Sequence, residues 1–176
     1  MLLRSVLRRA NDDDTARTLT STNAGPLFSD VANEDNESGT IYVLRSNSGD
    51  SYVKENREVL HKIGVTGGDI KKRVANAKND PTFLMADVEI IATYKLSNIN
   101  RVKLENLIHK FFESARMNIQ IKDRFGKAIT PREWFLVPLF IIDEVVKKIQ
   151  EGNIAEYKYD YESALLKLIS NGLFIR

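Results

Sequence analysis

Two short runs rich in β-branched residues most constrain the fold of this chain. Residues 39–44 read GTIYVL and residues 61–66 read HKIGVT, with a polar stretch, NSGD, at 47–50 between them. Ile, Val, Thr and Tyr favour strands, whereas clusters of Asn, Ser, Gly and Asp favour turns. The sequence therefore predicts two strands of a hairpin with a long connection.

Strand alternation decides which side chains of this hairpin share a face. Side chains two residues apart point to the same side of a strand, so Lys62 and Gly64 share a face while His61 takes the opposite one. In a suitable register Tyr42 of the first strand lies beside Lys62 and next to Gly64. The glycine would leave room for a ligand to approach.

The rest of the chain alternates between short strands and helices. Asp69 is a candidate N-cap for a helix over 69–78. The other predicted elements are a strand at 88–94, a helix from Asn98 or Asn100 to about Arg116, a short strand at 118–121, a strand start with a Trp anchor at 131–137, a helix at 139–150 and a final helix at 164–169. In the helix at 139–150 the residues predicted to face the core are Phe140, Ile141, Val145 and Ile149. The predicted fold class is α/β (α+β), with a small three-stranded, mostly antiparallel sheet flanked by helices.

Composition excludes several kinds of site. The 176 residues hold no cysteine, which rules out disulfides and thiolate zinc sites. The net charge is only +2, so nucleic-acid binding would depend on local clusters of cations. No apolar run approaches the roughly 20 residues of a membrane span, and we expect no contact with a membrane. The expected organisation is an arm or linker at 1–38, partly disordered or helical, a domain at 39–150 and an extension at 151–176.

Several residues in order resemble the GIY-YIG nuclease family. Its first motif stands here as Gly39-Thr40-Ile41-Tyr42, and its second as Lys62-Ile63-Gly64, a variant similar to the phage-type branch. Arg73 and Glu105 follow at the expected places. The run REWF at 132–135 also looks like that branch. The resemblance covers roughly residues 39–150.

This resemblance implies a metal-dependent endonuclease that hydrolyses DNA phosphodiester bonds. Glu105 would hold one Mg²⁺ or Mn²⁺ ion and Arg73 would lie beside the phosphate. Tyr42 would activate water if a nearby cation lowered its pKa. Lys62, which replaces the second tyrosine, would stabilise phosphate or a developing charge. His109, one helical turn after Glu105, could contact the phosphate or a metal-bound water, or it could be structural.

Basic residues near these motifs are candidates for DNA contact. They are Lys71, Lys72 and Lys78 after the hairpin, and Arg124 and Lys127 in a polar loop. A domain of about a hundred residues has little surface for reading bases, so specificity would need a further domain or a homodimer partner. We expect a cytoplasmic protein of a prokaryotic or phage-like system. The alternative is a nucleic-acid-binding or assembly module that retains the fold without catalysis.

Overall fold

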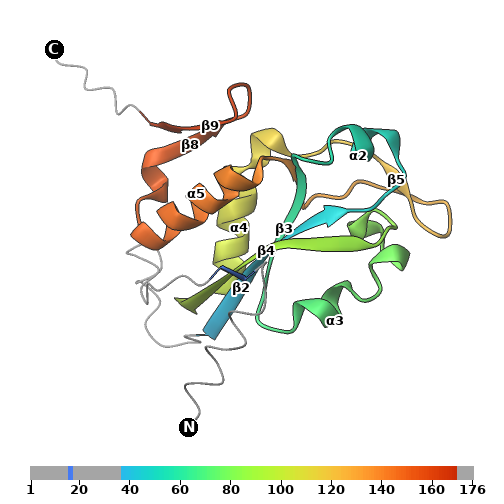
Figure 1. The fold of residues 1–176 in the computed structure, drawn as a ribbon, viewed down its shortest axis with the longest axis horizontal. Helices are drawn as coiled ribbons and strands as arrows, with labels where there is room; N and C mark the ends of the chain where they lie inside the picture. Colours follow the sequence, from blue (N-terminus) through green and yellow to red (C-terminus); the bar gives the residue numbers. More distant parts are fainter. Residues whose placement is uncertain (1–15, 18–36, 170–176) are drawn as a thin grey trace, which may run out of the picture.

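A five-stranded sheet forms the centre of the structure, a computed structural model that describes residues 16–17 and 37–169 (Figure 1). Its strand order is β1-β4-β2-β3-β7. The strands are β1 (Ala16–Arg17), β2 (Glu37–Ser46), β3 (Leu60–Thr66), β4 (Val88–Ile99) and β7 (Trp134–Leu136). The strands predicted at 39–44, 61–66 and 88–94 form the middle of this sheet. β7 at one edge confirms the strand start predicted at 131–137, and β1 lies at the other edge.

Helices and two small hairpins surround the sheet, which confirms the α+β class. The α-helices are α2 (Ser51–Glu55), α3 (Ile70–Val74), α4 (Arg101–Phe111) and α5 (Leu139–Glu151). Short 3-10 helices are η2 (Ala77–Asn79), η3 (Pro81–Phe83), η4 (Glu113–Ala115) and η5 (Ile154–Glu156). The hairpins pair β5 (Ile121–Lys122) with β6 (Ala128–Ile129), and β8 (Tyr157–Asp160) with β9 (Leu165–Leu168).

Both faces of the central sheet are covered. On one face Ile41, Val43 and Ile63 are buried in the main core, to which α4 and α5 also contribute. On the other face Tyr42 and Leu44 are buried in a smaller cluster with residues from α3, η2 and η3. Figure 1 shows α4 and α5 on one side of the sheet and α3 on the other. The faces predicted from strand alternation are therefore correct.

The register of the β2–β3 hairpin differs from the predicted pairing of Tyr42 with Lys62. Tyr42 lies opposite Gly64, and Lys62 lies opposite Leu44. Because Lys62 and Gly64 are two residues apart, all three side-chain positions still share one face. Tyr42 therefore covers a glycine rather than standing directly beside a lysine.

The starts of α3 and α4 follow the capping residues, whereas both helices end earlier than predicted. Asp69 accepts the Lys71 N–H at 2.9 Å at the start of α3, and Asn100 accepts the Lys103 N–H at 2.9 Å at the start of α4. The helix predicted over 69–78 divides into α3 and η2, and the one predicted to about Arg116 divides into α4 and η4. Helix α5 extends to Glu151, one residue beyond the predicted end, and Gly152 follows it with φ +73°.

Three predictions near the end of the chain were wrong or misplaced. The final helix predicted over 164–169 is the strand β9, paired with β8. An apolar run this short has the same appearance in a helix and in a strand. Phe140, predicted to face the core, is 60% exposed, although Ile141 beside it is buried. The strand predicted at 118–121 begins only at Ile121.

The predicted arm at 1–38 lies outside the described residues except for Ala16–Arg17 and the start of β2. Those two residues pair in parallel with Thr93 and Tyr94 of β4. Across 16–17 and 37–169, no helix is long and apolar enough to cross a membrane.

We predict that His61 makes folding sensitive to acid. Its ring is completely buried, and its Nδ1 donates to the Val137 carbonyl at 2.9 Å. Burial lowers the pKa of this imidazole below the ordinary 6.5, although the carbonyl opposes the shift. The unfolded chain therefore takes up a proton more readily as pH falls through about 6.5, which favours unfolding.

Thermal unfolding between pH 7.5 and 5 should show a falling melting temperature for the wild-type chain. His61→Asn retains a donor near the Nδ1 position and has no titrating ring, so its melting temperature should fall less over this range. An equal fall for both chains would show that His61 is not responsible.

Candidate functional site

Tyr42 and Gly64 lie at the centre of the candidate site, in contact across two neighbouring strands. The Tyr42 side chain is completely buried and lies across Gly64 of the neighbouring strand. A Cβ atom built on Gly64 would lie 2.3 Å from the Tyr42 Oη and 2.4 Å from its Cζ. Only glycine leaves the phenol this position. The space beside Gly64, expected from the sequence to admit a ligand, is therefore filled by the Tyr42 side chain.

Arg73 joins this phenol from α3. Its Nε donates to the Tyr42 Oη at 2.9 Å, and its guanidinium carbon lies 5.6 Å from the centre of the tyrosine ring. Arg73 is exposed overall, so the rest of its guanidinium faces solvent. The pair brings a permanent positive charge to the outer edge of a buried phenol.

The environment of Tyr42 favours its protonated form. Burial raises the pKa of the phenol above 10.0; Arg73 acts in the opposite direction, and the charges of Glu133 and Glu105 raise the pKa further. From the sequence we expected a nearby cation to lower this pKa. Arg73 does act in that direction, but burial has the larger effect and the pKa of Tyr42 is raised. At neutral pH Tyr42 is a hydrogen-bond donor, whose oxygen also accepts from Arg73.

Glu105 and His109 lie on α4 and bind the free edge of β3. Strand β7 pairs with β3 only as far as Lys62, so the backbone beyond it needs other partners. Glu105 Oε1 accepts the Val65 N–H at 3.1 Å, and His109 Nε2 donates to the Ile63 carbonyl at 2.7 Å. These bonds place the carboxylate next to the strand segment that holds Gly64.

Lys62 is buried and ion-paired with Glu133. Its ammonium bonds the Glu133 carboxylate and the Thr82 carbonyl, the latter at 3.3 Å, and lies 4.8 Å from the centre of the Phe83 ring. Its side chain is only 2% exposed. The predicted direct contact of Lys62 with a phosphate is therefore not favoured, because protein groups already surround the ammonium. What the lysine does is hold Glu133.

A second arginine, not predicted from the sequence, lies at the edge of the site. A Cβ atom on Gly67 would come within 1.5 Å of the Arg101 Nη1, so this guanidinium covers the turn after β3. Arg101 is one helical turn before Glu105 on α4. Its i, i+4 spacing from Glu105 is the signal that could have identified it.

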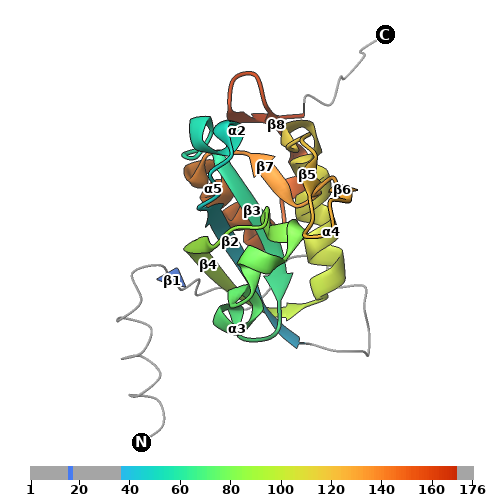
Figure 2. The same ribbon diagram turned by 90° about the vertical axis from the view of Figure 1, so that its right-hand side faces the viewer.

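The predicted DNA-binding residues form two exposed groups. Lys71 and Lys72 lie on α3 with Lys78 close behind in η2, whereas Arg124 and Lys127 lie in the turn between β5 and β6. Figure 2 shows α3 on one side of β3 and the β5–β6 hairpin on the other. The two groups therefore flank the strand that carries the candidate site.

Comparison with known families assigns the chain. The T5orf172 domain matches residues 39–150, which is more than half of the sequence. The chain belongs to the T5orf172 domain family. This match replaces the GIY-YIG assignment suggested by the motifs, which was wrong as a family assignment.

A curated relative has a similar sequence over much of the chain. "Uncharacterized protein YeeC" of Bacillus subtilis (strain 168) is 37% identical over 131 residues, which are 72% of this chain and 34% of the relative. The chain thus spans about a third of the length of that protein. No solved structure matches the chain. The T5orf172 domain indicates a nuclease-like or DNA-binding function.

The side chains of this T5orf172 domain that could bind a metal ion suit only an ion that needs few protein ligands. Among residues 16–17 and 37–169, no three His, Asp or Glu side chains gather as a metal-binding group. Glu105 accepts the Val65 N–H through Oε1, and Oε2 is the carboxylate oxygen that would bind a metal ion. Mg²⁺ keeps several waters and is commonly held by one or two carboxylates. The residues present are compatible with such an ion.

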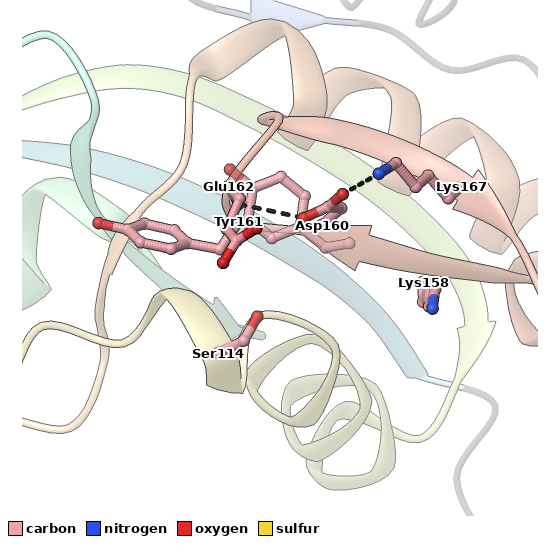
Figure 3. A pocket seen from close by; sticks show the side chains of 7 residues that line it. Ser114, Lys158, Asp160, Tyr161, Glu162 and Lys167 are labelled. Atoms are coloured by element: carbon pink, nitrogen blue, oxygen red, sulfur yellow. Dashed lines mark hydrogen bonds and ion pairs between the residues drawn. The ribbon is translucent and has the colours of Figure 1, made fainter.

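A separate cavity of about 430 Å³ lies at the β8–β9 hairpin (Figure 3). Its lining includes Lys158, Tyr161 and Glu162, and none of the predicted site residues. Asp160 in its wall is ion-paired with Lys167 and accepts from the Ser163 hydroxyl at 2.9 Å. These bonds lower the pKa of Asp160 to about 2. Both ribbon views place this hairpin at the opposite end of the T5orf172 domain from α3 (Figures 1 and 2).

We predict that Gly64→Ala displaces Tyr42. The new methyl group would overlap the phenol, so the ring must move away from Arg73 or the strands must separate. Overpacking of this kind costs roughly 1–3 kcal/mol. Urea unfolding would measure that loss.

The matched control is Gly49→Ala, because a Cβ atom there meets nothing within 4 Å. This variant should unfold close to the wild-type midpoint. If both variants had equal midpoints, the close contact between Gly64 and Tyr42 would be contradicted.

Proposed function

We propose that this T5orf172 domain is a metal-dependent endonuclease that hydrolyses DNA phosphodiester bonds. The observation that carries the proposal is the Arg73–Tyr42 hydrogen bond of 2.9 Å beside the β3 edge to which Glu105 is bonded. The backbone links the two groups, because Glu105 bonds the Val65 N–H and the neighbouring Gly64 lies under the Tyr42 phenol. A guanidinium, a phenol and a carboxylate suit phosphodiester hydrolysis, because charge at phosphorus must be neutralised while water attacks.

Arg73 binds the scissile phosphate in this proposal. Its Nε is fixed on Tyr42, which leaves the terminal nitrogens for phosphate oxygens. Preorganised donors of this kind stabilise the charge that develops in the transition state. Tyr42, buried and kept protonated by that burial, positions Arg73 through the hydroxyl oxygen that accepts from its Nε.

Glu105 is the residue that would hold a divalent ion, Mg²⁺ or Mn²⁺. When bound, such an ion supplies positive charge at the phosphate and lowers the pKa of its bound water. The Val65 N–H fixes the carboxylate to the sheet, so Glu105 does not need to be ordered on binding. His109 fixes the same helix to the same strand edge one turn further on.

Lys62 is a positioning residue in this account. It balances the negative charge of Glu133 and keeps that carboxylate at the wall of the site. The Glu133 side chain is 38% exposed, so solvent reaches it although its partner lysine is buried. Glu133 is therefore a second carboxylate able to accept a hydrogen bond from water.

DNA would lie across β3 between the two basic groups. Lys71, Lys72 and Lys78 would contact the backbone on one side, and Arg124 and Lys127 on the other. Backbone contacts position the nucleic acid without reading its sequence. Recognition of a target sequence would then come from a further domain or from a homodimer partner.

A second candidate function is a nucleic-acid-binding or assembly module without catalysis. One observation favours it: Tyr42 and Lys62 are both buried and already bonded to groups of the protein itself. The basic groups alone would suffice for such a role. Cleavage assays separate the two functions directly.

We predict that Glu105→Gln abolishes cleavage and leaves DNA binding intact. The amide keeps an oxygen for the Val65 N–H but loses the charge that would hold the ion. The rate of plasmid cleavage in Mg²⁺ or Mn²⁺ should fall at least about 100-fold. Affinity for duplex DNA in EDTA should stay within about twofold, since surface cations provide it.

Glu144→Gln is the matched control, because Glu144 is an exposed glutamate on α5. It should cleave at the wild-type rate. Full activity of Glu105→Gln would contradict the assignment of Glu105. No cleavage by the wild-type chain on any DNA or RNA with either metal would favour the binding module.

A further inference from the structure

The turn between β5 and β6 is fixed by its own hydrogen bonds. Asp123 Oδ1 accepts the N–H groups of Phe125 and Lys127, both at 2.8 Å. The Asp123 backbone donates to the Lys127 carbonyl at 2.9 Å and accepts from the Gly126 N–H at 3.0 Å. Gly126 has φ +79°, which favours glycine. The turn therefore presents the residue at its tip in a defined direction.

Phe125 stands at that tip and is 80% exposed. It belongs to none of the three hydrophobic clusters, so packing among the described residues does not explain it. The Arg124 guanidinium carbon lies 4.7 Å from the centre of its ring. This contact restricts the ring from one side, while the high exposure leaves aromatic surface for a ligand.

The hairpin that carries Phe125 is attached to the wall of the candidate site. Ile121 of β5 packs on the cluster that contains the buried Trp134. The Trp134 Nε1 donates to the Thr82 carbonyl at 3.0 Å, and the same carbonyl accepts from Lys62. The aromatic tip is thus anchored to the group that holds Glu133.

We propose that Phe125 stacks on an unpaired nucleic-acid base. Stacking on an aromatic side chain suits every base, because each base has a π-face. Arg124 and Lys127 beside the ring provide charges for the adjoining phosphates. The proposal rests on the proposed function, because it assumes that the nucleic acid bound at Arg73 also reaches Phe125.

The preferred substrate is then DNA with an extruded base, as in a bulge, rather than a continuous duplex.

A bulged duplex with 2-aminopurine as its unpaired base tests this proposal. The full chain is titrated in EDTA onto this duplex and onto a perfect duplex, with anisotropy and aminopurine fluorescence as readouts. The wild-type chain should bind the bulged duplex about tenfold more tightly and quench the aminopurine. Phe125→Ala should lose the preference and the quenching, but keep its affinity for the perfect duplex.

Two further variants make the result specific to stacking. Phe125→Trp keeps an aromatic face and should retain both signals. Leu168→Ala removes another exposed apolar side chain, on the distant β9, and should behave like the wild type. Wild-type quenching by Phe125→Ala would overturn the proposal. Equal affinity of the wild-type chain for the two duplexes would overturn it as well.

The binding and cleavage measurements distinguish failure of the stacking role from failure of the nuclease assignment. A chain that prefers the bulge and never cleaves would retain the stacking role and lose the catalytic one. A chain that cleaves DNA while Phe125→Ala binds both duplexes like the wild type would retain catalysis and lose the stacking role.

Discussion

The unpaired edge of β3 is the constraint on which the candidate site depends. Strand β7 pairs with only the first half of β3. Backbone groups of β3 beyond this pairing would destabilise the folded state if they were buried without hydrogen-bond partners. Glu105 and His109 of α4 provide those partners, at 3.1 and 2.7 Å. The same bonds that complete the sheet therefore hold a carboxylate and an imidazole beside Gly64 and the phenol that covers it.

The site is built so that buried groups fix the exposed ones. Tyr42 is buried and fixes Arg73; Lys62 is buried and fixes Glu133. Removing either buried partner would leave a polar group without its hydrogen bond and would also release the exposed residue. Such an arrangement reduces the ordering that binding of a phosphate would otherwise require. It also explains how one small face can hold opposite charges close together.

Local patterns in the sequence predicted much of this structure. The strand faces around Tyr42 follow from alternation, and Asp69 and Asn100 cap their helices as expected. The pairing of Lys62 with Glu133 could not be predicted, because it joins residues 71 positions apart through the path of β7. The raised pKa of Tyr42 could not be predicted either, because it results from burial, and a sequence motif does not show how deeply a side chain is buried. Motif order indicated a related kind of site, whereas the family itself came from the match to the T5orf172 domain.

Paramagnetic NMR with Mn²⁺ tests most directly whether the β3 edge forms the metal centre. The full chain, labelled with ¹⁵N, is titrated with substoichiometric Mn²⁺, which broadens amide signals close to the ion. We expect the signals of Gly64, Val65 and Gly67 to broaden first, and Glu105→Gln to prevent this broadening. Broadening that begins instead near Asp160 and Glu162, or that is unchanged in Glu105→Gln, would show that the β3 edge is not the metal centre.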